Sequence, residues 1–254
     1  MTQDLFRANA YLTECLATVS AITPQGIVLD RTVFYPLGGG QAGDTGSLVL
    51  ADGSEIAIVD SRKGKAEDGS FNQAICHLPA PEVLADLLTP APVGVRLAVG
   101  DSVTARIGWA RRHRLMRFHT ATHLLCHLVP QLVNGCSITP DYARLDFNMT
   151  DALDKEALTE GIALLVAAAH PVSVGAITDD ELDANPALVK SMSVQPPRGS
   201  GRIRTIRIGE AELIDFQPCG GTHVASSAEI GGVIVTKIEK KSASTRRVVL
   251  GFAA

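Results

Sequence analysis

The chain has 254 residues, 46% of them hydrophobic and 20% charged, which is typical of a soluble globular protein. No apolar run reaches the roughly 20 residues of a membrane-spanning helix, and the first ten residues lack a secretory segment, so we expect a cytoplasmic protein with no membrane contact. The net charge of −4 gives no support for nucleic-acid binding, but Arg and Lys gather at 106–117, 198–207 and 237–247. Such groups either contact phosphates or form ordinary solvated faces.

The five cysteines are odd in number and widely spaced, which predicts reduced thiols, one or more of them free to bind a metal.

The first part of the chain has the pattern of a β protein. Short alternating or β-branched runs are separated by turn residues, and Asp52-Gly53 lies between two of them as a hairpin signal. Residues 64–69 are predicted to form a polar loop and residues 79–88 a short helix or a turn. Strands at this spacing predict a small barrel or sandwich; they are expected at 17–22, 26–29, 47–50, 55–60, 72–77 and 102–107.

The second part of the chain combines helical and strand patterns. Apolar residues at three- and four-residue steps predict a helix over 115–132, and a second helix over 151–169 is expected to begin at Asp151 as its N-cap. Pro186 opens a predicted short helix ending near 192, before a flexible basic loop at 193–204. Strands are expected at 203–208, 211–216, 233–239 and 247–252. The class is therefore α+β, with domains at 1–108 and 109–254.

Two His-containing motifs predict a metal centre. His119 and His123 are four residues apart on the predicted helix, so both imidazoles lie on one face. Cys219 and His223 enclose Gly-Gly-Thr just after a predicted strand, where a turn can bring both side chains to a common point. Either pair alone would more often be an ordinary pair of side chains than a pair of metal ligands. The two pairs together favour a single zinc ion per chain.

Neighbouring residues limit this interpretation. Cys126 and His127 lie one turn further along the helix as further candidate ligands, with Cys126 favoured as a core residue. Thr120 stands where the HExxH motif of zinc proteases has its glutamate, which argues against a peptidase.

The glycine-rich segment 34–46, FYPLGGGQAGDTG, is the other unusual stretch. It lacks the pattern of a nucleotide phosphate loop. Either it forms tight turns between strands, or it places Gln41 and backbone amides beside a substrate ester.

Taken in order, FYPLGGGQAGDTG, HTATH and CGGTHV resemble the editing region of alanyl-tRNA synthetase and the free-standing AlaX proteins. The opening segment and the segment from EIGGVIVTKIEKKSAS to RRVV are similar to medium-length AlaX, so the resemblance covers nearly the whole chain. It implies an N-terminal β-barrel followed by an α/β editing domain whose helices pack on an antiparallel sheet. It also implies a zinc ion held by His119, His123, Cys219 and His223. Gln41 would contact substrate, Thr32 and Asp44 would support it, and Thr120 is a weaker candidate for the substrate pocket.

The resemblance also implies the reaction. The substrate would be the acceptor end of tRNA(Ala) carrying serine or glycine, and the protein would hydrolyse the aminoacyl ester. Editing in trans is expected because the aminoacylation domain and a long C-terminal extension are absent from this sequence. A synthetase pocket made for alanine cannot strongly reject serine by size, so a second hydrolytic site is needed. Gln41, Thr32 or Thr120 could supply the hydrogen bond that rewards the serine hydroxyl.

Three alternatives stay open from the sequence. Four protein ligands make a closed tetrahedron typical of structural zinc, so the ion could activate water, orient the substrate or organise the fold. A non-catalytic zinc-containing tRNA-binding module would use the same residues without turnover. The tripeptide Gly39-Gly40-Gln41 also occurs in peptide release factors, although its flanking residues here favour a turn between strands.

Overall fold

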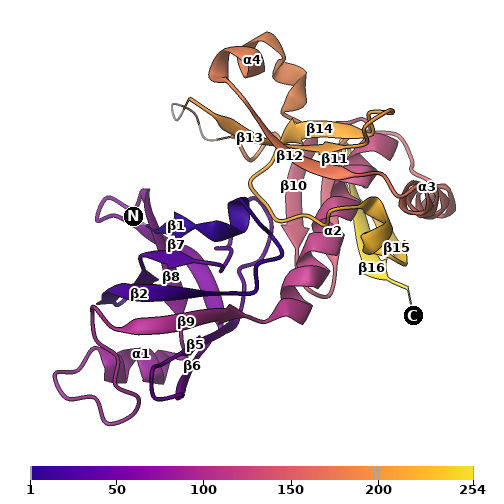
Figure 1. Cartoon of the computed structure of the whole chain (residues 1–254). Coiled ribbons are helices and arrows are strands. Elements are labelled where there is room, and N and C mark those ends of the chain that lie inside the picture. The colour runs from indigo at the N-terminus through magenta and orange to yellow at the C-terminus, as the bar shows by residue number, and fades with distance from the viewer. Residues whose placement is uncertain (1, 197, 199–200, 254) are drawn as a thin grey trace. The chain divides into compact units, whose positions relative to one another are not determined.

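The computed structural model describes residues 2–196, 198 and 201–253 (Figure 1). Its internal contacts divide the chain into two compact units. Unit 1 comprises Met1–Gly38 and Ala42–Arg112, and unit 2 comprises Gly39–Gln41 and His113–Ala254. The division falls inside a helix at 112, and it assigns three residues of the glycine-rich segment to unit 2. The domain limits 1–108 and 109–254 stay a prediction.

Unit 1 is built on an antiparallel sheet of seven strands, in the order β6-β5-β9-β2-β3-β8-β7. A short parallel pair, a 3-10 turn and one helix complete it. Among the described residues no pairing joins β6 to β7, so the β character of this region is confirmed, whereas closure into a barrel stays a prediction. The bounds are β1 Gln3–Asp4, η1 Leu5–Arg7, β2 Glu14–Thr23, β3 Gly26–Leu29, β4 Arg31–Thr32, β5 Gly46–Val49, β6 Glu55–Ile58, β7 Asp60–Lys65, β8 Phe71–Leu78, α1 Pro81–Leu87 and β9 Ser102–Ile107.

The core of unit 1 follows the two-residue period of its strands. In β9, Val103, Ala105 and Ile107 are buried and alternate with more exposed residues. The Asp52-Gly53 hairpin between β5 and β6 is confirmed. The prediction that a loop begins at residue 64 is wrong, because β7 continues to Lys65. There the Gln25 amide donates to the Lys65 carbonyl at 2.9 Å and accepts from the Lys65 N–H at 2.8 Å, which satisfies the strand end.

Thr32 and His77 form a buried polar pair inside unit 1. The Thr32 hydroxyl lies 2.7 Å from His77 Nε2, and His77 Nδ1 lies 2.9 Å from the Ile27 carbonyl. A carbonyl only accepts, so Nδ1 carries the proton and the Thr32 hydroxyl donates to Nε2. Thr32 also accepts from the Phe34 N–H at 3.1 Å. Both side chains are fully buried, so their hydrogen bonds hold the strand that leads into the glycine-rich segment.

Acidification is expected to destabilise unit 1 through His77. Burial lowers the pKa of His77 to about 4, from a usual 6.5, although the Ile27 carbonyl opposes this. Because the folded pKa is the lower one, the stability from neutral His77 is complete above pH 6.5 and is lost as the pH falls toward 4. Between about pH 7 and about pH 5 we expect a loss of about 2 kcal/mol. Urea unfolding at both pH values checks this, and His77→Gln, which cannot titrate, must show a smaller loss than the native protein.

Unit 2 contains two antiparallel sheets, one in the order β10-β11-β16-β15 and one in the order β12-β13-β14. The predicted α+β class, with helices and antiparallel sheets, is confirmed at this level. The bounds are α2 Trp109–Leu128, β10 Val133–Ile138, β11 Ala143–Asn148, α3 Lys155–Ala167, β12 Val172–Ile177, α4 Asp179–Ala184, η2 Pro186–Leu188, β13 Ile203–Ile208, β14 Asp215–Pro218, η3 Ser227–Ile230, β15 Val233–Ser242 and β16 Thr245–Phe252.

Helices α2 and α3 form the core of unit 2 with the four-stranded sheet. Phe118 of α2 stacks on Phe252 of β16, with ring centroids 4.1 Å apart. Figure 1 shows α3 beside β15, where the Thr159 hydroxyl accepts from the Val235 N–H at 3.1 Å. Packing of α2 against this core fixes the helix face that carries His119 and His123.

Several predicted boundaries in unit 2 are wrong. Helix α3 begins after Asp154, whose carboxylate accepts from the Ala157 N–H at 2.9 Å, so Asp154 and not Asp151 is the N-cap. The short helix expected from Pro186 is only a 3-10 turn, and α4 precedes it behind a capping box of Thr178 and Glu181. Of the predicted basic loop 193–204, Pro197, Gly199 and Ser200 lie outside the described residues.

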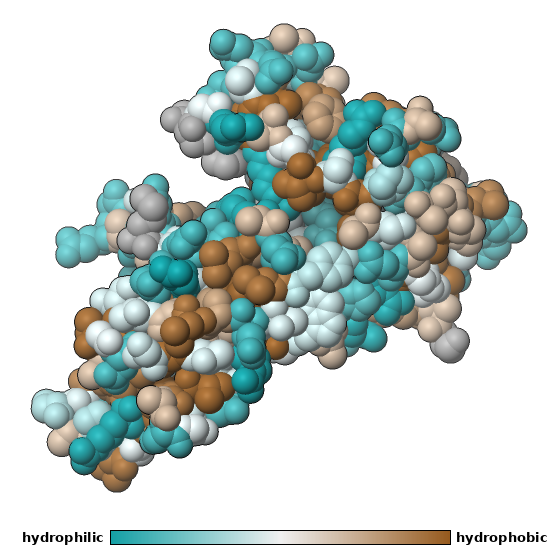
Figure 2. Space-filling view, in the orientation of Figure 1, coloured by the Kyte–Doolittle hydropathy of each residue, from teal (hydrophilic) through white to brown (hydrophobic). Residues whose placement is uncertain are grey.

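The surface matches the composition of the chain. No helix in the described ranges is both long enough and apolar enough to cross a bilayer. Figure 2 shows hydrophobic and hydrophilic residues in small mixed groups over the visible face, as expected for a protein whose exposed surface is partly apolar.

Candidate metal centre

Unit 2 brings the four predicted ligands together. His119 and His123 lie one turn apart on α2, while Cys219 and His223 lie in the loop that follows β14. One ligand atom from each of the four side chains lies within 4.8 Å of the others. The three histidines are buried. Three imidazoles and a thiol at this separation match the donor set that zinc prefers.

The inner edges of the histidine rings face the sulfur. His119 Nε2 lies 3.4 Å and His223 Nε2 3.3 Å from Cys219 Sγ. The Gly221 N–H also points at this sulfur, at 3.4 Å. A Cβ on Gly221 would overlap the His119 ring, so glycine is required there for the loop to approach the helix.

The outer edges of the same rings have protein partners. His119 Nδ1 lies 2.7 Å from Gln41 Oε1, and His123 Nδ1 lies 2.7 Å from Asp215 Oδ2. The third ring, His223, has its Nδ1 3.1 Å from the Thr120 hydroxyl. Oxygen acceptors on Nδ1 keep the proton there and leave the Nε2 lone pair for a metal, as in known zinc sites. The arrangement therefore fits a zinc ion.

Electrostatics favour a thiolate in the cluster. Burial opposes the ionisation of Cys219, but electrostatic interactions with the neighbouring histidines, His119 first, and hydrogen bonds to His119 and His123 hold its pKa well below the usual range. Burial also lowers the pKa of His223, to about 3, which keeps that ring neutral. His123 differs: burial lowers its pKa, yet Asp215 and Cys219 outweigh this effect and raise it to about 9.

Gln41 reaches this centre because the segment Gly39–Gln41 lies against β10. The Gly40 carbonyl accepts from the Ile138 N–H at 2.7 Å. Gly40 has a φ of +85°, and a Cβ there would lie 2.8 Å from Cys136 Sγ, so only glycine fits. The Gln41 amide donates to the Thr222 hydroxyl at 2.9 Å and accepts from the Thr222 N–H at 3.1 Å. One fully buried side chain thus fixes both the metal-binding loop and the His119 ring.

The other predicted residues have contacts of their own. Thr120 is fully buried and also accepts from the Val224 N–H at 3.3 Å. Within unit 1, Asp44 is buried against the Arg112 guanidinium and accepts from the Tyr35 N–H at 2.6 Å, and Thr32 bonds to His77. These contacts explain how each side chain is held; the catalytic roles of all four candidates, Gln41 included, stay predictions.

Cys126 and His127 are not in the cluster. Burial raises the pKa of the Cys126 thiol to about 12, as the prediction of a core residue implies. His127 Nδ1 lies 2.8 Å from the Ile214 carbonyl, an acceptor that holds the ring beside β14.

The motifs in the sequence do not reveal the residues behind His123. Asp215 lies four residues before Cys219, and Lys190 pairs with it from the segment after η2. The available signal was a carboxylate within the apolar run Leu213-Ile214-Asp215-Phe216, because a buried carboxylate requires a partner.

Comparisons with known proteins give the family of the chain. Residues 203–249, which include Cys219 and His223, match the family "Threonyl and Alanyl tRNA synthetase second additional domain". Residues 6–72 match "tRNA synthetases class II (A)". The alanyl-tRNA editing protein AlaX-M of Methanosarcina mazei is 34% identical, over 98% of this chain and 95% of its own length. The chain belongs to the AlaX-M family of alanyl-tRNA editing proteins.

Other relatives include a second AlaX-M protein and an alanine--tRNA ligase. The AlaX-M protein of Saccharolobus solfataricus is 31% identical over 98% of both chains. The alanine--tRNA ligase of Metallosphaera sedula is 32% identical over 94% of this chain but only 25% of its own length. The match to that ligase is therefore confined to about a quarter of it.

Proposed function

We propose that this protein is a zinc-dependent deacylase that removes serine or glycine from mischarged tRNA(Ala). The observation that carries the proposal is the cluster of His119, His123, Cys219 and His223, with an oxygen acceptor behind each imidazole. Family membership supports the substrate class, because the AlaX-M relatives are named for editing alanyl-tRNA. The acceptor end of tRNA(Ala) is the proposed partner.

The side chains divide the work as follows. His119, His123, Cys219 and His223 would hold the zinc ion, which would supply Lewis acidity toward an ester carbonyl or water. Gln41, Asp215 and Thr120 hold the three rings in one tautomer, so the ligand geometry is set before substrate arrives. Cys219 contributes the negative charge of a thiolate, and the Gly220-Gly221 turn admits its close approach to His119.

Selectivity is proposed to depend on hydrogen bonding to the serine hydroxyl. A site that rewards a substrate hydroxyl leaves its own polar group unpaired when alanine binds, and that cost discriminates between the two. Gln41, Thr120 and Thr32 are the proposed donors or acceptors, with Asp44 in support. Alanine variants of each, compared by their serine-to-alanine rate ratio, test this assignment: an unchanged ratio in all of them contradicts it.

Deacylation of purified Ser-, Gly- and Ala-tRNA(Ala) tests the function directly. We expect the native protein to release serine at least about a hundredfold faster than alanine. Chelation should abolish serine release, and added zinc should restore it. A folded, zinc-loaded protein that binds tRNA but deacylates none of the three would instead be the non-catalytic binding module.

A further inference from the structure

Asp215, the partner of His123, is held by three donors from three segments. Its Oδ2 accepts from His123 Nδ1 of α2 at 2.7 Å and from the Gln217 amide of β14 at 2.8 Å. Its Oδ1 accepts from Lys190 Nζ, which comes from the segment after η2. These three partners therefore fix the orientation of the carboxylate.

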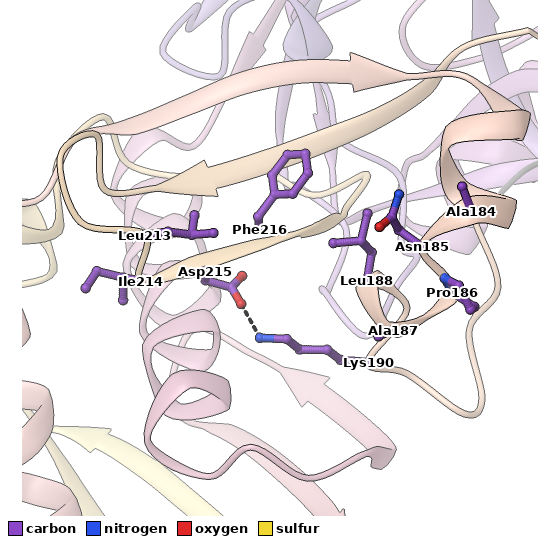
Figure 3. A pocket seen from close by; sticks show the side chains of 10 residues that line it. All are labelled: Ala184, Asn185, Pro186, Ala187, Leu188, Lys190, Leu213, Ile214, Asp215 and Phe216. Atoms are coloured by element: carbon purple, nitrogen blue, oxygen red, sulfur yellow. Dashed lines mark hydrogen bonds and ion pairs between the residues drawn. The ribbon is translucent and has the colours of Figure 1, made fainter.

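Lys190 and Asp215 both line an open cavity. The cavity has a volume of about 460 Å³, and its lining includes Leu188, Lys190, Leu213, Asp215 and Phe216. Figure 3 shows the Lys190 ammonium directed at Asp215 along this wall. The Asp215 side chain is nevertheless 0% exposed, whereas that of Lys190 is 26% exposed. Lys190 is therefore the member of the pair with exposed side-chain surface.

We propose that Lys190 is a positioning residue for the metal ligand His123, acting through Asp215. The ion pair fixes Oδ1, so that Oδ2 stays aligned with His123 Nδ1 and the Nε2 lone pair faces the cluster. This inference rests on the proposed metal centre, and it adds a third layer behind the ligands. Lys190 lies outside the three sequence motifs.

The chemistry explains why a cation is needed at this position. Without Lys190, donors would approach only one oxygen of Asp215. The other oxygen would then carry a buried, uncompensated charge, which is costly. The carboxylate would therefore tend to turn toward water in the cavity. Loss of the ammonium would therefore weaken the hold of Asp215 on His123. Outer partners of zinc-binding histidines typically contribute 10–100-fold to metal affinity, and we expect Lys190 to act within that range.

Zinc affinity, measured by competition with a chromophoric chelator, tests the proposal. Lys190→Met should bind zinc about 10–100-fold more weakly than the native protein, and Lys190→Arg, which keeps the cation, should recover most of the loss. Lys237→Met is the matched control in the same unit, because Lys237 is exposed and pairs with Glu239 at 2.8 Å; the zinc affinity of this variant should not change. At saturating cobalt, the visible bands of Lys190→Met should shift, since the geometry at His123 changes.

The outcomes separate the two proposals. If the native protein binds no zinc, the metal centre and the proposed function fail together. If the native protein binds zinc and Lys190→Met binds it equally well, only the role of Lys190 fails. Thermal unfolding of the metal-free variants provides the remaining check: a Lys190→Met protein that is unfolded without metal would give Lys190 a general structural role and overturn the proposal.

Discussion

Replacing Cys219 by alanine is expected to abolish zinc binding at micromolar metal and to eliminate deacylation. Cys219 is the one anionic ligand, and the Nε2 atoms of His119 and His223 both face its sulfur. The lowered pKa of its thiol favours the thiolate form that binds zinc. Changes behind a ligand cost 10–100-fold in affinity, so loss of the ligand itself should cost more than about 100-fold. Zinc content per chain and the rate of serine release measure the effect.

Cys136→Ala is the matched control for this experiment. Cys136 lies in β10 of the same unit, beside Gly40, but it is not one of the clustered ligands. Burial raises the pKa of its thiol to about 12, so it stays protonated. The control variant should retain zinc and activity. Full activity in Cys219→Ala, or equal losses in the two variants, would contradict the assigned ligand set.

Replacing Arg112 by methionine is expected to destabilise unit 1 by about 3–5 kcal/mol, because it leaves the buried carboxylate of Asp44 without its countercharge. The two side chains are 0% and 1% exposed. The Arg112 guanidinium also donates to the carbonyls of Ala10 and Val33, at 2.8 Å and 2.7 Å. One cation thus joins three separate segments of unit 1. Urea unfolding of the native and variant proteins measures the difference.

Arg106→Met supplies the comparison for Arg112→Met. Arg106 pairs with Glu14 at 2.9 Å in the same unit, but both side chains are about half exposed. Exposed pairs contribute about 0–1 kcal/mol, so this variant should unfold nearly as the native protein does. Similar losses in both variants would mean that burial does not decide the strength of the Asp44–Arg112 pair.

Local patterns predicted the parts of the fold that depend on local geometry. The strands at 26–29, 102–107 and 203–208 have strong alternation or β-branched residues, and they form as expected. Strands β10, β11 and β12 were missed. Most of β12 is exposed, so it lacks a clear hydrophobic period. In β10, Gly135 and Ser137 interrupt the hydrophobic pattern. Helix α4 was missed because it is short and acidic, with only Leu182 buried.

The candidate site shows the same limit. Helical spacing predicts that His119 and His123 share one face, and the Gly-Gly turn predicts that Cys219 and His223 converge; both pairs do so. Spacing cannot show which residues support them, because those contacts depend on tertiary structure. Gln41 lies 78 residues from His119 and 181 from Thr222 in sequence, yet it bonds to both. Lys190 and Asp215 likewise come together only in the folded unit.

The segment Gly39–Gln41 makes unit 2 discontinuous in the chain. A contiguous fragment that began at α2 would carry all four clustered side chains. The His119 ring would, however, lose the Gln41 amide that contacts it. The four clustered side chains therefore cannot be moved into another protein together with this support as one stretch of sequence. A recombination event that separated the glycine-rich motif from the two histidine motifs would divide unit 2.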